Sequence, residues 1–288
     1  MGFEPTTTSL GDITKSIDWE DFKEYLNKVY RANWSKQCFC YAKKYYHFLE
    51  NPSKLETFNG YTKNNIRKAL ISLSKYLGVY RQFKAKTEDY GIKWSRSTAI
   101  DAFFRMINNK NHDVLKWLEE NTKLLDRNCS TYLKFVVLSG LRANEAIDSF
   151  NLIIKLGAEG RLREYYNEDL QTLEHFRYPK LFFRNTKNCF ITMISRTLIE
   201  EIAKCNLMTY DIIRKKLQRR NKPTRINELR DYYATFMVRH NLIKEEVDLL
   251  QGRIGKSIFI RHYFSPAIKE LKQRVLKALK ELEQIILS

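Results

Sequence analysis

The stretch STYLKFVVLSGLRANEAIDSF, residues 130–150, decides the fold of this chain. The run that ends at Leu138 is strongly apolar, which predicts a buried helix. Ser139 and Gly140 predict a tight turn, and a second helix is expected after it. Arg142 stands at the start of that helix, a poor place for an unpaired charge. Glu145, three residues later, can hold and orient its guanidinium, and a purely structural ion pair is the alternative reading.

The N-terminal part predicts a small helical bundle. Residues 1–15 hold Gly, Pro, Thr and Ser with little periodicity and predict a flexible arm. Helices are expected after Asp18 as N-cap, over about 35–49, and from about Thr62 to Gly78. The charged, poorly periodic segment 84–97 predicts a linker. The first helix would bury one face, made of Trp19, Phe22, Leu26 and Val29.

The C-terminal part predicts further helices and one small β element. Two β-rich runs, 180–184 and 189–195, flank turn-prone residues and predict a hairpin. A final amphipathic helix is expected over 266–287, either docked on its own domain or packed onto a neighbouring subunit. The predicted fold class is therefore mainly α with a small β-hairpin or sheet. The stripe of the final helix comprises Ile268, Leu271, Val275, Leu279, Leu282 and Ile286.

The charge balance points to a polyanionic partner. The chain has 51 Lys and Arg against 33 Asp and Glu, a formal net charge of +18. A lysine-rich solvated surface is the alternative, but an excess of this size favours nucleic acid. With 43% hydrophobic residues the chain can bury a core, so it is not a disordered basic tail.

Several other classes of protein are not supported. The five cysteines are scattered and predict free thiols in a reducing compartment. No apolar run is long enough for a bilayer and no secretion leader is evident, although MGFEPT loosely matches a myristoylation pattern. A phosphate-binding Gly-rich loop and clustered metal ligands are both missing. Neither a metal nor another cofactor is therefore expected.

Three further motifs join the Arg142 turn. Arg230 lies in NELRDYYATF, beside aromatic and small residues, and Arg253 follows the helix-ending Gly252 in LLQGRIG. Tyr263 stands ten residues later, in IRHYF. Taken in order, these motifs resemble the tyrosine recombinase (integrase) superfamily, and the L-Q-G-R spelling is most similar to integrases of archaeal viruses and plasmids. Lys187 falls where that family carries a β-hairpin lysine. The resemblance covers roughly residues 110–270.

The resemblance implies the domains and the partners. Residues 16–95 would form a helical core-binding domain that contacts DNA, and residues 96–288 the catalytic domain. The partners would be double-stranded DNA at attachment sites and further copies of the chain, four on DNA, with no membrane. The protein would act in the host cytoplasm, associated with the nucleoid.

The resemblance also implies the chemistry. Tyr263 would attack a DNA phosphodiester and form a covalent 3′-phosphotyrosyl bond, without metal or ATP. Arg142, Arg230 and Arg253 would bind the non-bridging oxygens, because arginine stays charged and donates in a fork. Lys187 would protonate the leaving 5′-oxygen.

Two positions depart from the family pattern. Asn227 stands where most members have histidine, and an amide cannot shuttle a proton, so the general base is open. His262, beside the tyrosine, and Lys187 are candidates to help, although an exposed helix residue is the favoured reading of His262. Arg253 replaces the usual histidine or tryptophan and keeps a donor.

The function expected is site-specific recombination that integrates and excises a mobile element. A type IB topoisomerase, which uses the same tyrosine chemistry to relax supercoils, is one alternative. A non-catalytic DNA-binding protein of the same fold is the other, because of Asn227.

Overall fold

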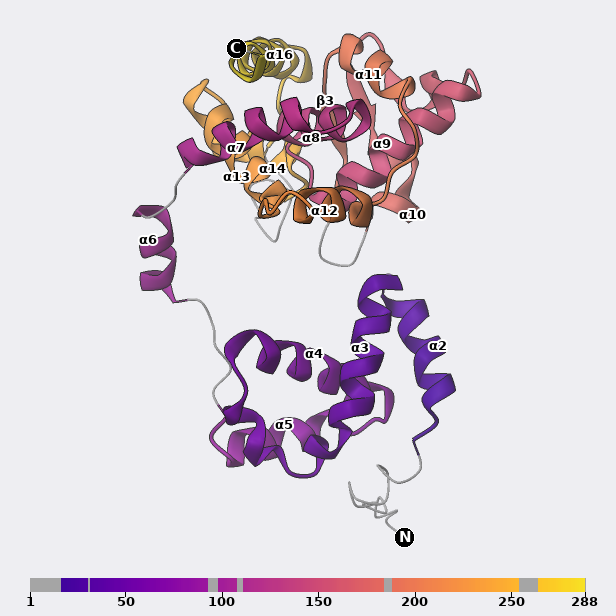
Figure 1. Cartoon of the computed structure of the whole chain (residues 1–288), viewed down its shortest axis with the longest axis vertical. Coiled ribbons are helices and arrows are strands. Elements are labelled where there is room, and N and C mark those ends of the chain that lie inside the picture. Colours follow the sequence, from indigo (N-terminus) through magenta and orange to yellow (C-terminus); the bar gives the residue numbers. More distant parts are fainter. Residues whose placement is uncertain are drawn as a thin grey trace. The chain divides into compact units, whose positions relative to one another are not determined.

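The computed structural model describes residues 17–30, 32–92, 98–107, 111–183, 188–253 and 264–287. The chain divides into two compact units, Met1–Ile107 and Asn108–Ser288. Both are built mainly of helices, and the second also holds a three-stranded antiparallel sheet (Figure 1). The prediction of a mainly α fold with a small sheet is thereby confirmed. None of the described helices is long and apolar enough to cross a membrane.

The first unit is a helical bundle with its own core. Its helices are α2 (Trp19–Val29), α3 (Ala32–Tyr45), α4 (Gly60–Tyr76), α5 (Tyr80–Asp89) and α6 (Ala99–Ile107), with 3₁₀ helices at Tyr46–Leu49 and Pro52–Thr57. Asp18 caps α2 as predicted, because its carboxylate accepts from the amides of Glu20 (3.1 Å) and Asp21 (3.0 Å). Phe22 and Leu26 are buried beneath it.

Two expectations for this unit are wrong. Val29 is 50% exposed, so the buried face of α2 stops short of its last residue. The expected linker 84–97 begins inside α5, which continues to Asp89. Phe83 and Thr87 explain this extension, since both are buried and hold α5 onto the bundle despite its high charge.

The second unit is built around α8 and α9. Its helices are α7 (Asn111–Leu124), α8 (Arg127–Ser139), α9 (Ala143–Ala158), α10 (Pro179–Phe182), α11 (Arg196–Ala203), α12 (Tyr210–Gln218), α13 (Ile226–Arg239), α14 (Lys244–Leu250) and α16 (Ile268–Leu287), with 3₁₀ turns at Leu162–Glu164 and His175–Arg177. Helix α8 contacts α7, α9, α11, α13 and α16. Residues 130–150 thus form the predicted buried helix, turn and second helix.

The sheet corrects the predicted hairpin. Strands β1 (Tyr166–Asn167), β2 (Thr172–Glu174) and β3 (Ile191–Met193) pair in that order, with Leu173 opposite Thr192. The run 189–195 supplies β3, but its partner is β2, and the described residues 180–183 of the other run form no strand. Pro179 instead starts the short helix α10, because its fixed φ suits a first helical turn.

The C-terminal helix α16 packs on its own unit. It contacts α7, α8, α13 and β3, and Figure 1 shows it almost end-on, above α7 and α8 in the view. Its predicted stripe is confirmed, since five of the six residues are buried and Ile268 is partly buried against the core. In the single chain, α16 is therefore docked on its own domain, the first of the two alternatives expected for it. The buried five are Leu271, Val275, Leu279, Leu282 and Ile286.

Candidate active site

A tight turn between α8 and α9 presents Arg142. Gly140 has a φ of +62°, and a Cβ there would lie 2.4 Å from the Tyr233 ring, so only glycine fits. Arg142 then caps α9: its amide donates to Glu145 Oε2 (3.2 Å), and its Nη1 donates to Glu145 Oε1 (2.7 Å). Glu145 is fully buried, whereas the Arg142 side chain is 24% exposed. The predicted pairing of Glu145 with Arg142 is confirmed, and the Arg142 side chain remains partly exposed.

Arg230 lies buried in α13 and joins two turns. Its Nη1 donates to the Gly140 carbonyl oxygen (2.7 Å), and its Nη2 donates to the Gln251 carbonyl oxygen (2.8 Å). The Gln251 side-chain amide donates in return to the Arg230 carbonyl (3.0 Å). The two acceptors belong to the residues two positions before Arg142 and Arg253. One buried guanidinium therefore ties together the turns that carry the other two arginines.

The second turn follows α14 and presents Arg253. Gly252 has a φ of +64°, and a Cβ there would lie 1.7 Å from the carbonyl oxygen of Asn188. The Arg253 amide donates to the Asp248 carbonyl (2.7 Å), which closes the turn. The Arg253 side chain is exposed. The contact at Gly252 also places Asn188, next in sequence to Lys187, beside this turn.

The charges of the three arginines act on one another. Burial, and then the positive charge of Arg142, lower the pKa of the Arg230 guanidinium to about 10, with a further contribution from Arg253 and opposition from Glu145. A group with that pKa is still charged at pH 7. The Cys189 thiol lies in the same field, where burial and Glu145 raise its pKa, so it remains protonated and unreactive. The cluster of Arg142, Arg230 and Arg253 thus offers positive charge to an anion such as a phosphate.

The other predicted site residues divide into two groups. Asn227 is exposed on the first turn of α13, three residues before Arg230. Lys187, Tyr263 and His262 lie outside the described residues. The structure therefore brings together the three predicted arginines and places Asn227 one helical turn from the buried one.

Sequence reasoning missed Gln251. Its side chain is fully buried, and its main chain and side chain both bond to Arg230. The available signal was the position of Gln251 directly before a glycine and an arginine, similar to Ser139-Gly140, which precede Arg142 with Leu141 in between. Among the described residues, no group of three His, Cys, Asp or Glu side chains could hold a metal ion.

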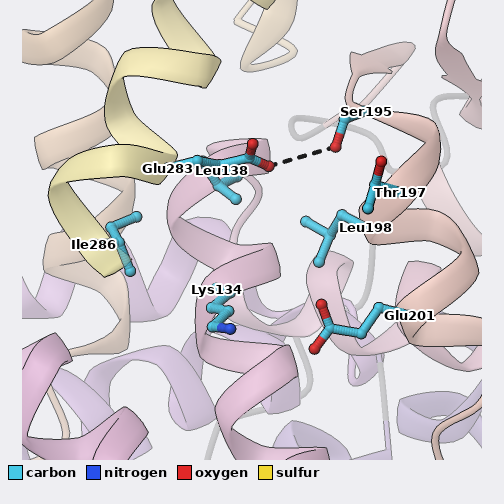
Figure 2. A pocket seen from close by; sticks show the side chains of 8 residues that line it. All are labelled: Lys134, Leu138, Ser195, Thr197, Leu198, Glu201, Glu283 and Ile286. Atoms are coloured by element: carbon cyan, nitrogen blue, oxygen red, sulfur yellow. Dashed lines mark hydrogen bonds between the residues drawn. The ribbon is translucent and has the colours of Figure 1, made fainter. Parts of the chain in front are cut away.

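A separate cavity of about 220 Å³ lies between α8, α11 and α16. Figure 2 shows the Glu283 carboxylate turned toward Ser195, whose hydroxyl donates to it over 3.4 Å. Burial is the main cause that raises the pKa of Glu283. No member of the arginine cluster lines the cavity, so it is not part of the candidate active site. The lining residues are Lys134, Leu138, Ser195, Thr197, Leu198, Glu201, Glu283 and Ile286.

Comparison with known proteins agrees with the motifs. A family model described as archaeal phage integrase matches residues 106–272, close to the 110–270 span expected from the sequence. No curated protein matches the chain. The matched segment covers more than half of the chain and contains Arg142, Arg230 and Arg253. The chain therefore belongs to the archaeal phage integrase family.

Proposed function

We propose that this integrase cleaves and rejoins DNA through a covalent bond between Tyr263 and a 3′-phosphate. The family makes the chain a site-specific recombinase that acts on DNA. The observation that supports the finer proposal is that the buried guanidinium of Arg230 bonds to both turns that carry Arg142 and Arg253, whose charges lower its pKa. The positive charge of three arginines suits a phosphodiester whose non-bridging oxygens gain charge in the transition state.

The reaction would run in two balanced steps. The Tyr263 hydroxyl gives up its proton to solvent or a neighbouring base as its oxygen bonds to phosphorus, the bond from phosphorus to the 5′-oxygen breaks, and Lys187 gives a proton to that oxygen. A 5′-hydroxyl then gives its proton back to Lys187 as it attacks the phosphorus, the phosphotyrosyl bond breaks, and the released tyrosine oxygen takes up a proton. One phosphoester replaces another at each step, so this route needs no ATP.

The arginines would divide the work by exposure. Arg230 donates one N–H to each of two carbonyls, so its remaining N–H groups and its charge would be left to bind the phosphate. Arg142 and Arg253 reach solvent and would approach the two non-bridging oxygens directly. Asn227 would donate or accept a hydrogen bond there without moving a proton.

Recombination joins two duplexes, so the proposal includes four copies of the chain on DNA. The basic bundle of the first unit would grip the duplex as a core-binding domain. Four lysines in that bundle lie over aromatic rings, which orders their charges for phosphate contacts. The pairs are Lys43 with Phe39, Lys44 with Tyr45, Lys68 with Trp34 and Lys75 with Tyr80.

The test is a protein–DNA adduct that survives SDS. Wild-type protein incubated with duplex DNA carrying a candidate attachment site is expected to form it, and Tyr263→Phe is expected to form none, because the nucleophilic oxygen is gone. Equal adduct from both proteins would refute the tyrosine mechanism. Relaxation of plasmids that lack the site, without recombinants, would favour the topoisomerase alternative instead.

A further inference from the structure

The start of α14 is clamped by the C-terminal helix. Glu246 is 5% exposed, and its carboxylate accepts from the Ile243 amide (3.1 Å) and from both terminal nitrogens of Arg274 in α16, at 2.8 Å for Nη1. Arg274 Nη1 also donates to the Asn241 carbonyl (3.1 Å). One side chain of α16 therefore holds both the loop between α13 and α14 and the first turn of α14.

The ion pair is a strong one for this chain. Burial alone would raise the pKa of Glu246, but the hydrogen bonds from Arg274 and Ile243 lower it overall. Two parallel donors to one carboxylate also fix direction as well as distance. The pair therefore ties the first turn of α14 to α16.

The other end of α14 reaches the arginine cluster. Seven residues, Lys244–Leu250, span about 10 Å at the usual helical rise. Gln251 continues the helical hydrogen bonding, since its amide donates to the Val247 carbonyl (2.9 Å). Gln251 then receives Arg230 Nη2 at its carbonyl and returns its side-chain amide to the Arg230 carbonyl. A short rigid helix thus connects Arg274 to the guanidinium of Arg230.

We propose that Arg274 is a positioning residue for the arginine cluster: through Glu246 and α14 it sets Gln251, and thereby the orientation of Arg230 and the turn that carries Arg253. Docking of α16 on its own unit would then be a condition for an ordered anion site, not only a contribution to stability. The catalytic consequence rests on the proposed function, whereas the effect on Arg230 does not.

A matched control lies on the same helix. Glu281 of α16 pairs with His240 at the end of α13, at 3.0 Å. Arg274→Met and Glu281→Met each remove one side-chain contact between α16 and the rest of the unit and leave an unbranched side chain, but only the contact of Arg274 leads to α14. If these contacts matter only because they hold α16 in place, the two variants will behave alike.

The first measurement uses DNA-free full-length protein labelled with ¹⁵N-arginine. The N–H signals of the Arg230 guanidinium, assigned with Arg230→Lys, are expected to exchange slowly with solvent in wild type and in Glu281→Met. In Arg274→Met their exchange is expected to be about tenfold faster or more, since looser hydrogen bonds open more often. Equal exchange in all three proteins would overturn the proposal. Arg274→Lys, which keeps the charge but not the fork, replaces Arg274→Met should the latter fail to fold, and the same tenfold change is expected.

The second measurement is adduct formation on the attachment-site duplex. Arg274→Met is expected to react about 10- to 100-fold more slowly than wild type at unchanged DNA affinity, because small misplacements at a reacting centre are costly. A methylphosphonate at the scissile position removes the charge that the arginines neutralise, so on that substrate the two proteins should differ less. If Arg274 had only a structural role, Arg274→Met would slow the reaction by the same factor on both substrates. That result would contradict the proposal. Absence of adduct in wild type, with the difference in Arg230 exchange present, would refute the proposed function and leave the positioning role standing.

Discussion

The two turns that carry Arg142 and Arg253 are alike in construction and different in surroundings. Each has a glycine in the left-handed region, and each gives one carbonyl to Arg230. Arg142, however, is held by the buried carboxylate of Glu145, whereas Arg253 is exposed. The first turn therefore combines folding and anion binding, and the second presents a charge that can move toward its target.

The glycines offer the largest expected effect. Gly252→Ala would force a Cβ onto a main-chain oxygen of Asn188, and Gly140→Ala onto the ring of Tyr233. We expect losses of unfolding free energy of about 4 and about 3 kcal/mol respectively, because a backbone yields less than a side chain. Chemical denaturation measures both. Gly78→Ala is the control, since φ is +74° there with open space around it, and about 1 kcal/mol is expected. Equal losses at all three glycines would show that backbone conformation alone matters.

Removal of the first exposed arginine should affect folding as well as activity. Arg142→Ala leaves the Glu145 carboxylate buried without its guanidinium, and we expect about 3 kcal/mol less stability. The double variant Arg142→Ala with Glu145→Gln should recover part of this loss, because no charge then stays buried. Thermal or urea unfolding tests this. No recovery in the double variant would mean that the carboxylate is not what makes the single change costly.

The turn that carries Arg253 packs against the segment that leads into β3, and we expect acid to lower the stability of that segment. Gly252 abuts Asn188, three residues before β3, and β3 is held by a buried chain in which His175 bonds to Tyr165 (2.6 Å) and Thr192 (2.8 Å). Burial lowers the pKa of His175 to about 3. The unfolded chain takes up a proton near pH 6.5 and the folded one does not. The stability from neutral His175 is thus fully present above pH 6.5 and declines as pH falls toward 3.

We expect this decline to approach about 1.4 kcal/mol per pH unit, or about 2 kcal/mol between pH 6.5 and 5. Urea unfolding at several pH values, compared with His175→Gln, isolates the contribution. If the unfolding free energy of His175→Gln falls with pH as steeply as that of wild type, the decline comes from other groups.

The smallest effect on stability is expected at the second exposed arginine. Arg253→Ala removes an exposed side chain and should change the unfolding free energy by less than about 0.5 kcal/mol. Adduct formation should nevertheless fall by about 100-fold, the usual cost of one donor to a charged transition state. A stability loss as large as that of Arg142→Ala would erase the proposed difference between the turns.

Local features of the fold were predictable from the sequence where local chemistry decides them. The Asp18 cap, the Gly140 turn and the Arg142–Glu145 pair each depend on residues within a few positions of one another. The hairpin prediction failed because strand propensity in residues 180–184 was overridden by Pro179, and because β3 found its partner in β2. The linker prediction failed at α5 because burial of Phe83 outweighed a charged composition.

The sequence by itself determined the helical framework, the three arginines as candidates and the glycines that turn the chain before two of them. Only the tertiary structure decided that Arg230 is the buried centre of the cluster. Its two hydrogen bonds reach residues 90 and 21 positions away, and no periodicity or propensity reports such pairings. They arise because α8, α13 and α14 pack around one core, which leaves a buried guanidinium with two main-chain carbonyls as its available partners.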